Sequence, residues 1–128
     1  MTTGKTVEAV VDAAGPDVRV QFLIGDGVIG TWAADARGGE LRERRWVGRS
    51  NDRFPDEVRL KATPLQDGQV VLHWVISLLG PTLDAPYHVR VKVEQRSRSV
   101  LDEPVRFSGT VAAGSVTELA GAVAFRAK

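Results

Sequence analysis

The clearest structural signal in this chain is the stretch YHVRVKVEQ, residues 87–95. Apolar side chains occupy alternate positions from Tyr87 to Val93, and polar or charged side chains occupy the positions between them. This period of two is typical of a β-strand that turns one face towards a core and the other towards water. A helix would scatter the same apolar residues around its circumference. The segment is therefore predicted to be a half-buried strand.

The same alternation recurs along the chain, at 18–24, 58–62, 105–111 and 119–125. Residues 70–78 are apolar on one face and mixed on the other, as expected of a central strand. Turns rich in Gly, Pro, Asn and Asp separate these segments, so no connection has room for a crossover helix. We predict an antiparallel β-sandwich of about eight or nine short strands, with a closed β-barrel as the alternative. Residues 6–12 fit either a strand or a short helical turn, and residues 96–104 fit a strand with a bulge.

The composition is that of a globular protein with nearly balanced charges. A chain of 128 residues has the usual size of one domain, so we expect a single unit over residues 1–128. The formal net charge of +1 favours neither nucleic acid nor an anionic membrane as a partner. The chain has no cysteine, no leader-like start and no apolar run of the ~20 residues that span a bilayer. We therefore expect a soluble, cytoplasmic protein.

Residues 25–30, Gly-Asp-Gly-Val-Ile-Gly, match the G-x-G-x-x-G pattern of dinucleotide-binding loops. Such a loop needs a helix after its glycines and an acidic residue about 20 positions further on. The residues that follow are poor helix formers and lead into an arginine-rich segment. We interpret the pattern as a hairpin turn, in which Gly25 and Gly27 supply positive φ angles, and we expect no nucleotide cofactor.

The chain has two histidines, His73 and His88, as candidates for general base catalysis. If residues 69–79 and 87–95 form a hairpin with their apolar faces inward, His73 lies opposite Glu94 and His88 lies at the loop end. The two histidines are then too far apart to share a metal or to form a dyad. His73 and Glu94 are interpreted as a surface contact, and an enzyme is not expected.

Three tryptophans raise the possibility of a stacking platform for a sugar ring. Trp74 and Trp32 occupy the same alternate positions as the apolar residues of their strands, so both are predicted to lie in the core. Trp46 lies in the segment LRERRWVGR, residues 41–49, and is the candidate for an exposed ligand platform. The charges of this segment are typical of an edge strand that avoids pairing with other molecules.

A self-association face is predicted from the last two strands. If residues 105–111 and 117–127 form a hairpin, small side chains line its outward face. The predicted interface residues are Ser108, Thr110, Ala120, Ala122 and Ala124. The alternative is that the N-terminal segment of the same chain covers this face.

A weak metal site is predicted from the order of the loops. In an antiparallel sandwich successive loops alternate between the two ends, which gathers several acidic loops at one end. Carboxylates on adjacent loops repel one another, and Ca²⁺, with 6 to 8 oxygen ligands, would neutralise them. The candidate metal ligands are Asp26, Asp52, Asp56 and Asp84. The alternative is that these aspartates are ordinary turn residues.

These patterns favour a non-catalytic binding module that acts through protein contacts, including contacts with a second copy of itself. The alternative function is a sandwich that binds a divalent cation or a carbohydrate at its loops. A small enzyme is the third possibility.

Overall fold

The computed structural model describes residues 3–25, 28–38, 41–50, 56–65, 70–80, 83–101 and 105–127. These residues form ten strands and one short 3₁₀ turn, η1 (Thr63–Leu65). The strands are β1 (Thr3–Val11), β2 (Val18–Ile24), β3 (Ile29–Gly38), β4 (Leu41–Arg49), β5 (Glu57–Leu60), β6 (Val71–Leu79), β7 (Ala85–Gln95), β8 (Arg98–Ser99), β9 (Val105–Val111) and β10 (Val116–Ala127). Among the described residues, no helix is long and apolar enough to cross a membrane.

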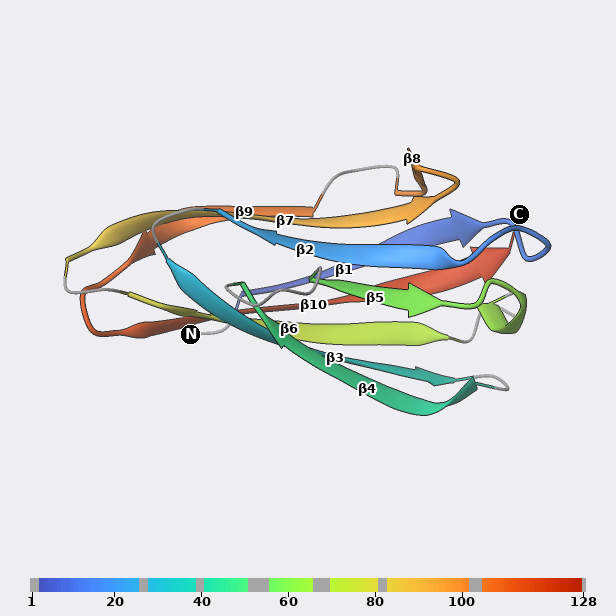
Figure 1. The fold of residues 1–128 in the computed structure, drawn as a ribbon, viewed down its shortest axis with the longest axis horizontal. Helices are drawn as coiled ribbons and strands as arrows, with labels where there is room; N and C mark the ends of the chain where they lie inside the picture. The colour runs from blue at the N-terminus through green and yellow to red at the C-terminus, as the bar shows by residue number, and fades with distance from the viewer. Residues whose placement is uncertain are drawn as a thin grey trace.

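The strands form two sheets that pack face to face, so the fold is the predicted β-sandwich (Figure 1). The first sheet has the strand order β1-β10-β6-β3-β4. The second has the order β5-β2-β7-β8, with β9 also paired to β7. Edge strands bound each of these paths, and the described residues do not close a barrel. The edge position predicted for residues 41–49 is confirmed, because β4 ends the first sheet.

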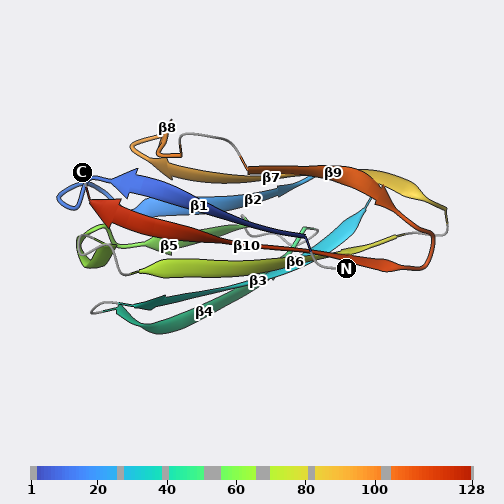
Figure 2. The ribbon, with the colours of Figure 1, turned by 180° about the vertical axis from the view of Figure 1, so that it is seen from behind.

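One strand pair departs from the predicted antiparallel arrangement. Strand β1 runs parallel to β10, from the pair of Thr3 with Leu119 to the pair of Val11 with Ala127 (Figure 2). Residues 6–11 are therefore a strand and not a helical turn. Ala9 and Val11 are fully buried against the core. This burial explains why β1 extends the sheet from the edge of β10.

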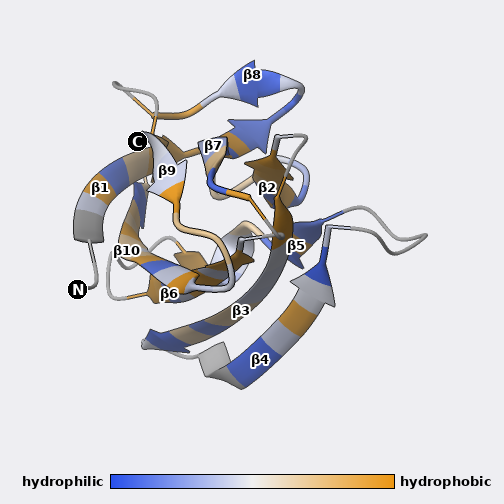
Figure 3. Ribbon diagram, turned by 90° about the vertical axis from the view of Figure 1, so that its left-hand side faces the viewer, coloured by the Kyte–Doolittle hydropathy of each residue, from blue (hydrophilic) through white to orange (hydrophobic). Residues whose placement is uncertain are grey.

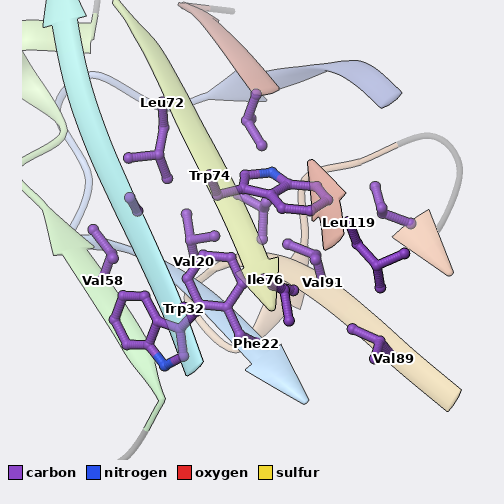
Figure 4. Close-up of a cluster of buried hydrophobic side chains, with 14 of the residues drawn as sticks. Val20, Phe22, Trp32, Val58, Leu72, Trp74, Ile76, Val89, Val91 and Leu119 are labelled. Carbon is purple, nitrogen blue, oxygen red and sulfur yellow. The ribbon is translucent and has the colours of Figure 1, made fainter. Parts of the chain in front are cut away.

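Aromatic rings from both sheets alternate through the centre of the core (Figure 4). The ring of Phe22 on β2 stacks on Trp32 of β3, with 4.7 Å between centroids. Phe22 also meets the edge of Trp74 on β6 at 6.1 Å, and Trp74 meets Phe107 on β9 at 5.6 Å. The predicted core positions of Trp32 and Trp74 are confirmed. Edge-to-face and offset contacts of this kind bind the two sheets to each other.

The glycine-rich connection at residues 25–28 is not the predicted hairpin. It carries the chain from β2 in the second sheet to β3 in the first. Gly25 has no positive φ angle; instead its amide donates a hydrogen bond of 3.0 Å to the carbonyl oxygen of His88. A Cβ on Gly25 would lie 3.1 Å from the same oxygen. Close approach of two backbones is the reason for glycine here, while Gly27 lies outside the described residues.

Candidate functional site

The outer face of the first sheet carries most of the exposed apolar surface of the described residues. Six large hydrophobic side chains are strongly exposed, and five of them lie on this face. These five are Ile29, Val47, Val75, Leu79 and Val116. Val47 is the most open of them, with 74% of its surface exposed. Contiguous exposed apolar surface on a folded protein commonly marks a contact site.

Strand register places these side chains in two rows across the sheet. Val116, Leu79 and Ile29 form one row, which lies four residues along β6 from the row that contains Val75 and Val47. Ala120, Val75, Ala33 and Val47 face one another across β10, β6, β3 and β4. This row is apolar from one strand to the next, and small and larger side chains alternate along it. We call it the central row.

Two hollows lie along β3 on this face. One, of about 560 Å³, is lined by Thr31, Ala33, Val47, Val75 and Ser77 among others. The second, of about 250 Å³, shares Ala33, Val47 and Val75 with it and continues towards His73 and Arg45. The shared residues belong to the central row. The small side chain of Ala33 therefore forms the floor of a groove whose walls are β4 and β6.

Polar rows lie on both sides of the central row. On one side, Glu118, Ser77, Thr31 and Arg49 follow one another across the same four strands. On the other side, the order is Ala122, His73, Asp35 and Arg45. The face is therefore basic along β4, while Glu118 places an acidic group on β10. Asp35 also accepts a hydrogen bond of 2.7 Å from Nε of Arg37 on its own strand.

The outer face of the second sheet has a different character. Its exposed or half-exposed side chains are mainly charged. The cationic ones are Arg19, Arg59, Arg90, Lys92 and Arg106, and the anionic ones are Glu57 and Glu94. In the first sheet, by contrast, the exposed Val47 interrupts the charged residues of β4, as the orange band on this strand in Figure 3 shows. The outer face of the second sheet therefore suits contact with water, whereas the first sheet exposes apolar groups that burial would stabilise.

The predicted interface residues do not share one face. Strand β9 pairs with β7 in the second sheet, whereas β10 pairs with β1 and β6 in the first. The expected hairpin between them is wrong for this reason. Ser108 and Thr110 lie on the outer face of the second sheet, and only Ala120, Ala122 and Ala124 lie on the outer face of the first. Among the described residues of the N-terminal segment, β1 lies beside these alanines at the sheet edge and not over them as the alternative required. Ala122 is only 6% exposed.

The histidines are also placed differently from the prediction. Strands β6 and β7 belong to different sheets, so His73 does not face Glu94. His73 instead pairs with Asp35 on β3 and with Ala122 on β10. Glu94 pairs with Arg19, and His88 pairs with Ser108, both in the second sheet. The two histidines lie on opposite outer faces of the sandwich.

Trp46 is half-buried and packs against the core instead of standing exposed. The guanidinium carbon of Arg44 lies 4.9 Å from the centroid of the Trp46 ring. This cation–π contact occupies one face of the indole. The geometry does not favour Trp46 as a platform for a sugar.

The predicted metal ligands are only partly described. Asp26 and Asp52 lie outside the described residues. Asp56 accepts a hydrogen bond of 2.9 Å from Nε1 of Trp32, and Asp84 accepts one of 2.8 Å from the amide of Ala113. The carbonyl oxygen of Asp56 accepts a hydrogen bond from the amide of Phe22, so Asp56 lies beside Phe22. Phe22 in turn pairs with Val91 on β7. Asp84 directly precedes β7, seven residues before Val91 in the chain.

At ~3.3 Å per residue, that interval separates Asp56 from Asp84 by roughly 23 Å along the strand direction. The structure does not bring these two carboxylates together. Both instead act as turn residues that accept hydrogen bonds. No group of three metal-ligating side chains occurs among the residues that the structure describes.

Sequence reasoning missed the contributions of β3, β4 and β6 to the apolar face. A signal was present in residues 70–79, because Val71, Val75 and Leu79 make the second face of that strand partly apolar. The pattern predicts a central strand, and β6 does lie between β10 and β3. Because the second sheet covers only the inner face of this central strand, the apolar residues on its outer face are exposed.

No family model, curated protein or solved structure matches the chain. Its function is therefore inferred from the geometry of the chain itself.

Proposed function

We propose that this protein is a non-catalytic interaction module that binds another protein surface through the outer face of its β1-β10-β6-β3-β4 sheet. The observation that carries the proposal is the gathering of Ile29, Val47, Val75, Leu79 and Val116 on that one face. Burial of exposed apolar side chains of this size is favourable, by about 25 cal/mol for each Å² that leaves water.

The form of the face also supports a protein partner. Its groove is open and lined by β4 and β6. The polar row of Glu118, Ser77, Thr31 and Arg49 lies between the central row and a second apolar row of Val116, Leu79 and Ile29. Apolar surface interspersed with polar groups is usual in protein–protein interfaces. A small-molecule pocket, in contrast, encloses most of its ligand.

The placement of the titratable side chains gives less support to catalysis. General acid–base or nucleophilic catalysis needs groups within hydrogen-bond reach of one another. His73 and His88 lie on opposite faces, and Ser77 lies four residues along β6 from His73. At ~3.3 Å per residue this spacing is roughly 13 Å, too long for a nucleophile and its base.

A photoreactive amino acid placed at Val47 tests the proposal in cells that express the protein. Position 47 is exposed on the edge strand β4, in the central row of the proposed contact face, so irradiation is expected to produce a covalent adduct with a protein of discrete mass. The same photoreactive residue at Lys92, on the charged face of the second sheet, is the matched control. Adducts are expected at position 47 and not at position 92.

A second substitution links the adduct to the face itself. Ala33→Glu places a charge on the floor of the groove and should abolish the adduct formed from position 47. Equal labelling from positions 47 and 92, or labelling that Ala33→Glu leaves unchanged, would contradict the proposal.

A further inference from the structure

We infer that the partner of this face is a second copy of the chain, related by a two-fold axis that runs parallel to the strands and midway between β6 and β3. The inference rests on the proposed function, because it uses the same face. In such a dimer the outer faces of the two first sheets meet. The axis places β10 of one copy over β4 of the other, and β6 over β3.

Side-chain size along the central row is self-complementary under this axis. The order Ala120, Val75, Ala33, Val47 alternates small and larger residues. The two-fold axis reverses the order in the second copy. Val75 therefore enters the groove above Ala33 of the other copy, and Val47 lies over Ala120. Each larger side chain meets a smaller one, which is the condition for close packing across an isologous interface.

Charge is self-complementary under the same axis. In one neighbouring row, the order Glu118, Ser77, Thr31, Arg49 places Glu118 of one copy over Arg49 of the other. Ser77 then lies over Thr31, where two hydroxyl groups can exchange a hydrogen bond.

The row on the other side of the centre also avoids like charges. Its order is Ala122, His73, Asp35, Arg45, so the same axis places His73 of one copy over Asp35 of the other. Arg45 lies over the small, uncharged side chain of Ala122. Neither polar row therefore brings two groups of the same charge together.

A two-fold axis perpendicular to the strands fits this face less well. Such an axis would place each strand over itself in the second copy. The basic strand β4 would then face β4, and β6 would face β6. Size and charge therefore favour the axis parallel to the strands over the perpendicular one.

The area available is compatible with a modest dimer. Four strands ~4.8 Å apart and nine residues of ~3.3 Å each give a face of roughly 19 Å by 30 Å. This projected area, about 570 Å², is somewhat below the ~800 Å² per partner of a standard interface. The sheet is curved, with its outer side convex, so the contact centres on β6 and β3 (Figure 3). Solution measurements should therefore extend from micromolar to millimolar protein.

Charge reversal with mixing tests the arrangement. In Glu118→Arg, a dimer would bring the introduced arginine of each copy against Arg49 of the other. In Arg49→Glu, it would bring the introduced glutamate of each copy against Glu118 of the other. Sedimentation equilibrium is expected to show a dimer for the wild type and a dissociation constant raised about tenfold or more for each single variant.

A mixture of the two single variants can form a dimer that contains only attractive pairs. The arginine introduced in one chain then meets the glutamate introduced in the other, and the native Arg49 and Glu118 that remain also meet. The mixture is therefore expected to regain the wild-type dissociation constant, as is the double variant Glu118→Arg with Arg49→Glu. Within one copy, β10 and β4 are three strands apart, roughly 14 Å, so the recovery reports a contact between copies. Recovery on mixing also shows that both single variants are folded.

The outcomes separate this inference from the proposed function. A wild type that stays monomeric at millimolar concentration overturns the inference, as does a dimer whose stability the single reversals do not change. If the wild type is monomeric and position 47 still labels a different protein in cells, the interaction module stands and the self-contact is excluded. If neither a dimer nor an adduct forms, both proposals fail.

Discussion

Two tryptophans in the same core differ in the partner of their indole N–H. Nε1 of Trp32 donates a hydrogen bond of 2.9 Å to Oδ1 of Asp56. Nε1 of Trp74 is buried and, among the described residues, has no hydrogen-bond partner. A buried donor without an acceptor costs about 1–3 kcal/mol of stability relative to a satisfied one.

This difference predicts unequal losses of stability for two equal changes in size. Trp32→Phe removes a satisfied donor and leaves Oδ1 of Asp56 without it, so the loss of hydrogen bonding adds about 1–3 kcal/mol to the loss of packing. Trp74→Phe removes the unsatisfied donor, which offsets part of its loss of packing. Urea denaturation of both variants should therefore show a lower free energy of unfolding for Trp32→Phe. Equal losses in the two variants would contradict this account.

Gln95 shows what a buried polar side chain contributes. Its Oε1 accepts a hydrogen bond of 2.8 Å from the amide of Asp12, and its Nε2 donates to the carbonyl oxygens of Asp12 and Pro16 at 2.9 and 3.0 Å. These bonds attach the turn between β1 and β2 to the end of β7. Gln95→Ala is expected to lower the free energy of unfolding by about 3 kcal/mol, near 1 kcal/mol for each bond. Arg98→Ala, an exposed change on the neighbouring short strand, is the control and should cost under about 0.5 kcal/mol. Urea denaturation measures both changes.

At the scale of elements, two tight turns depend on left-handed backbone. Arg96 and Ser97 join β7 to β8 with φ angles of 56° and 61°, although neither is glycine. Two central residues with positive φ are typical of a type I′ hairpin turn. Gly114, between β9 and β10, has a φ of 69°, and a Cβ built on it meets no heavy atom within 4 Å. At Gly114, therefore, the effect of a substitution on stability comes from the backbone conformation and not from packing.

Reciprocal substitutions in these turns should change stability in opposite directions. Ser97→Gly relieves a non-glycine residue in left-handed backbone and is expected to raise the free energy of unfolding by about 0.5–1 kcal/mol. Gly114→Ala introduces the same penalty in open space and is expected to lower it by about 1 kcal/mol. Thermal and urea unfolding measure both. If Gly114→Ala instead raises the free energy of unfolding, the steric cost of a side chain in left-handed backbone does not control stability at this turn.

At the scale of the whole molecule, the proposed dimer predicts that stability depends on protein concentration. A partner that binds only the folded chain raises the unfolding midpoint by mass action. The melting temperature of the wild type should therefore rise as the concentration increases from micromolar to millimolar. Val75→Glu, which places a charge opposite the groove of the second copy, should remove this dependence. Lys92→Glu, on the outer face of the second sheet, should leave the dependence in place.

The alternation of side chains was sufficient to predict strands, their inward faces and the sandwich. Tyr87, Val89, Val91 and Val93 are buried, and the polar residues between them face outwards, as the period of two requires. The same reasoning predicts that Trp32 and Trp74 lie in the core, and both are buried. Such information is local, because the two faces of a strand are defined by the strand alone.

Strand pairing was not predictable in the same way. Hairpins between neighbouring strands were expected for His73 with Glu94 and for Ser108 and Thr110 with the alanines of β10, but the chain crosses between the sheets at these points. Pairing across sequence-distant strands, such as β1 with β10, depends on how both sheets bury their inner faces together. No single stretch of sequence contains the information on how the two sheets pack together.

The alternation of residues along the chain is enough to define the apolar side of each strand, and therefore to show that two half-buried layers form one core. Which strands become neighbours depends on the folded arrangement, because the free energy of pairing depends on the packing of both sheets at once. The order β10-β6-β3-β4 places Ala120, Val75, Ala33 and Val47 in one row. These residues lie far apart in the chain, and their common surface exists only after the sheet has formed.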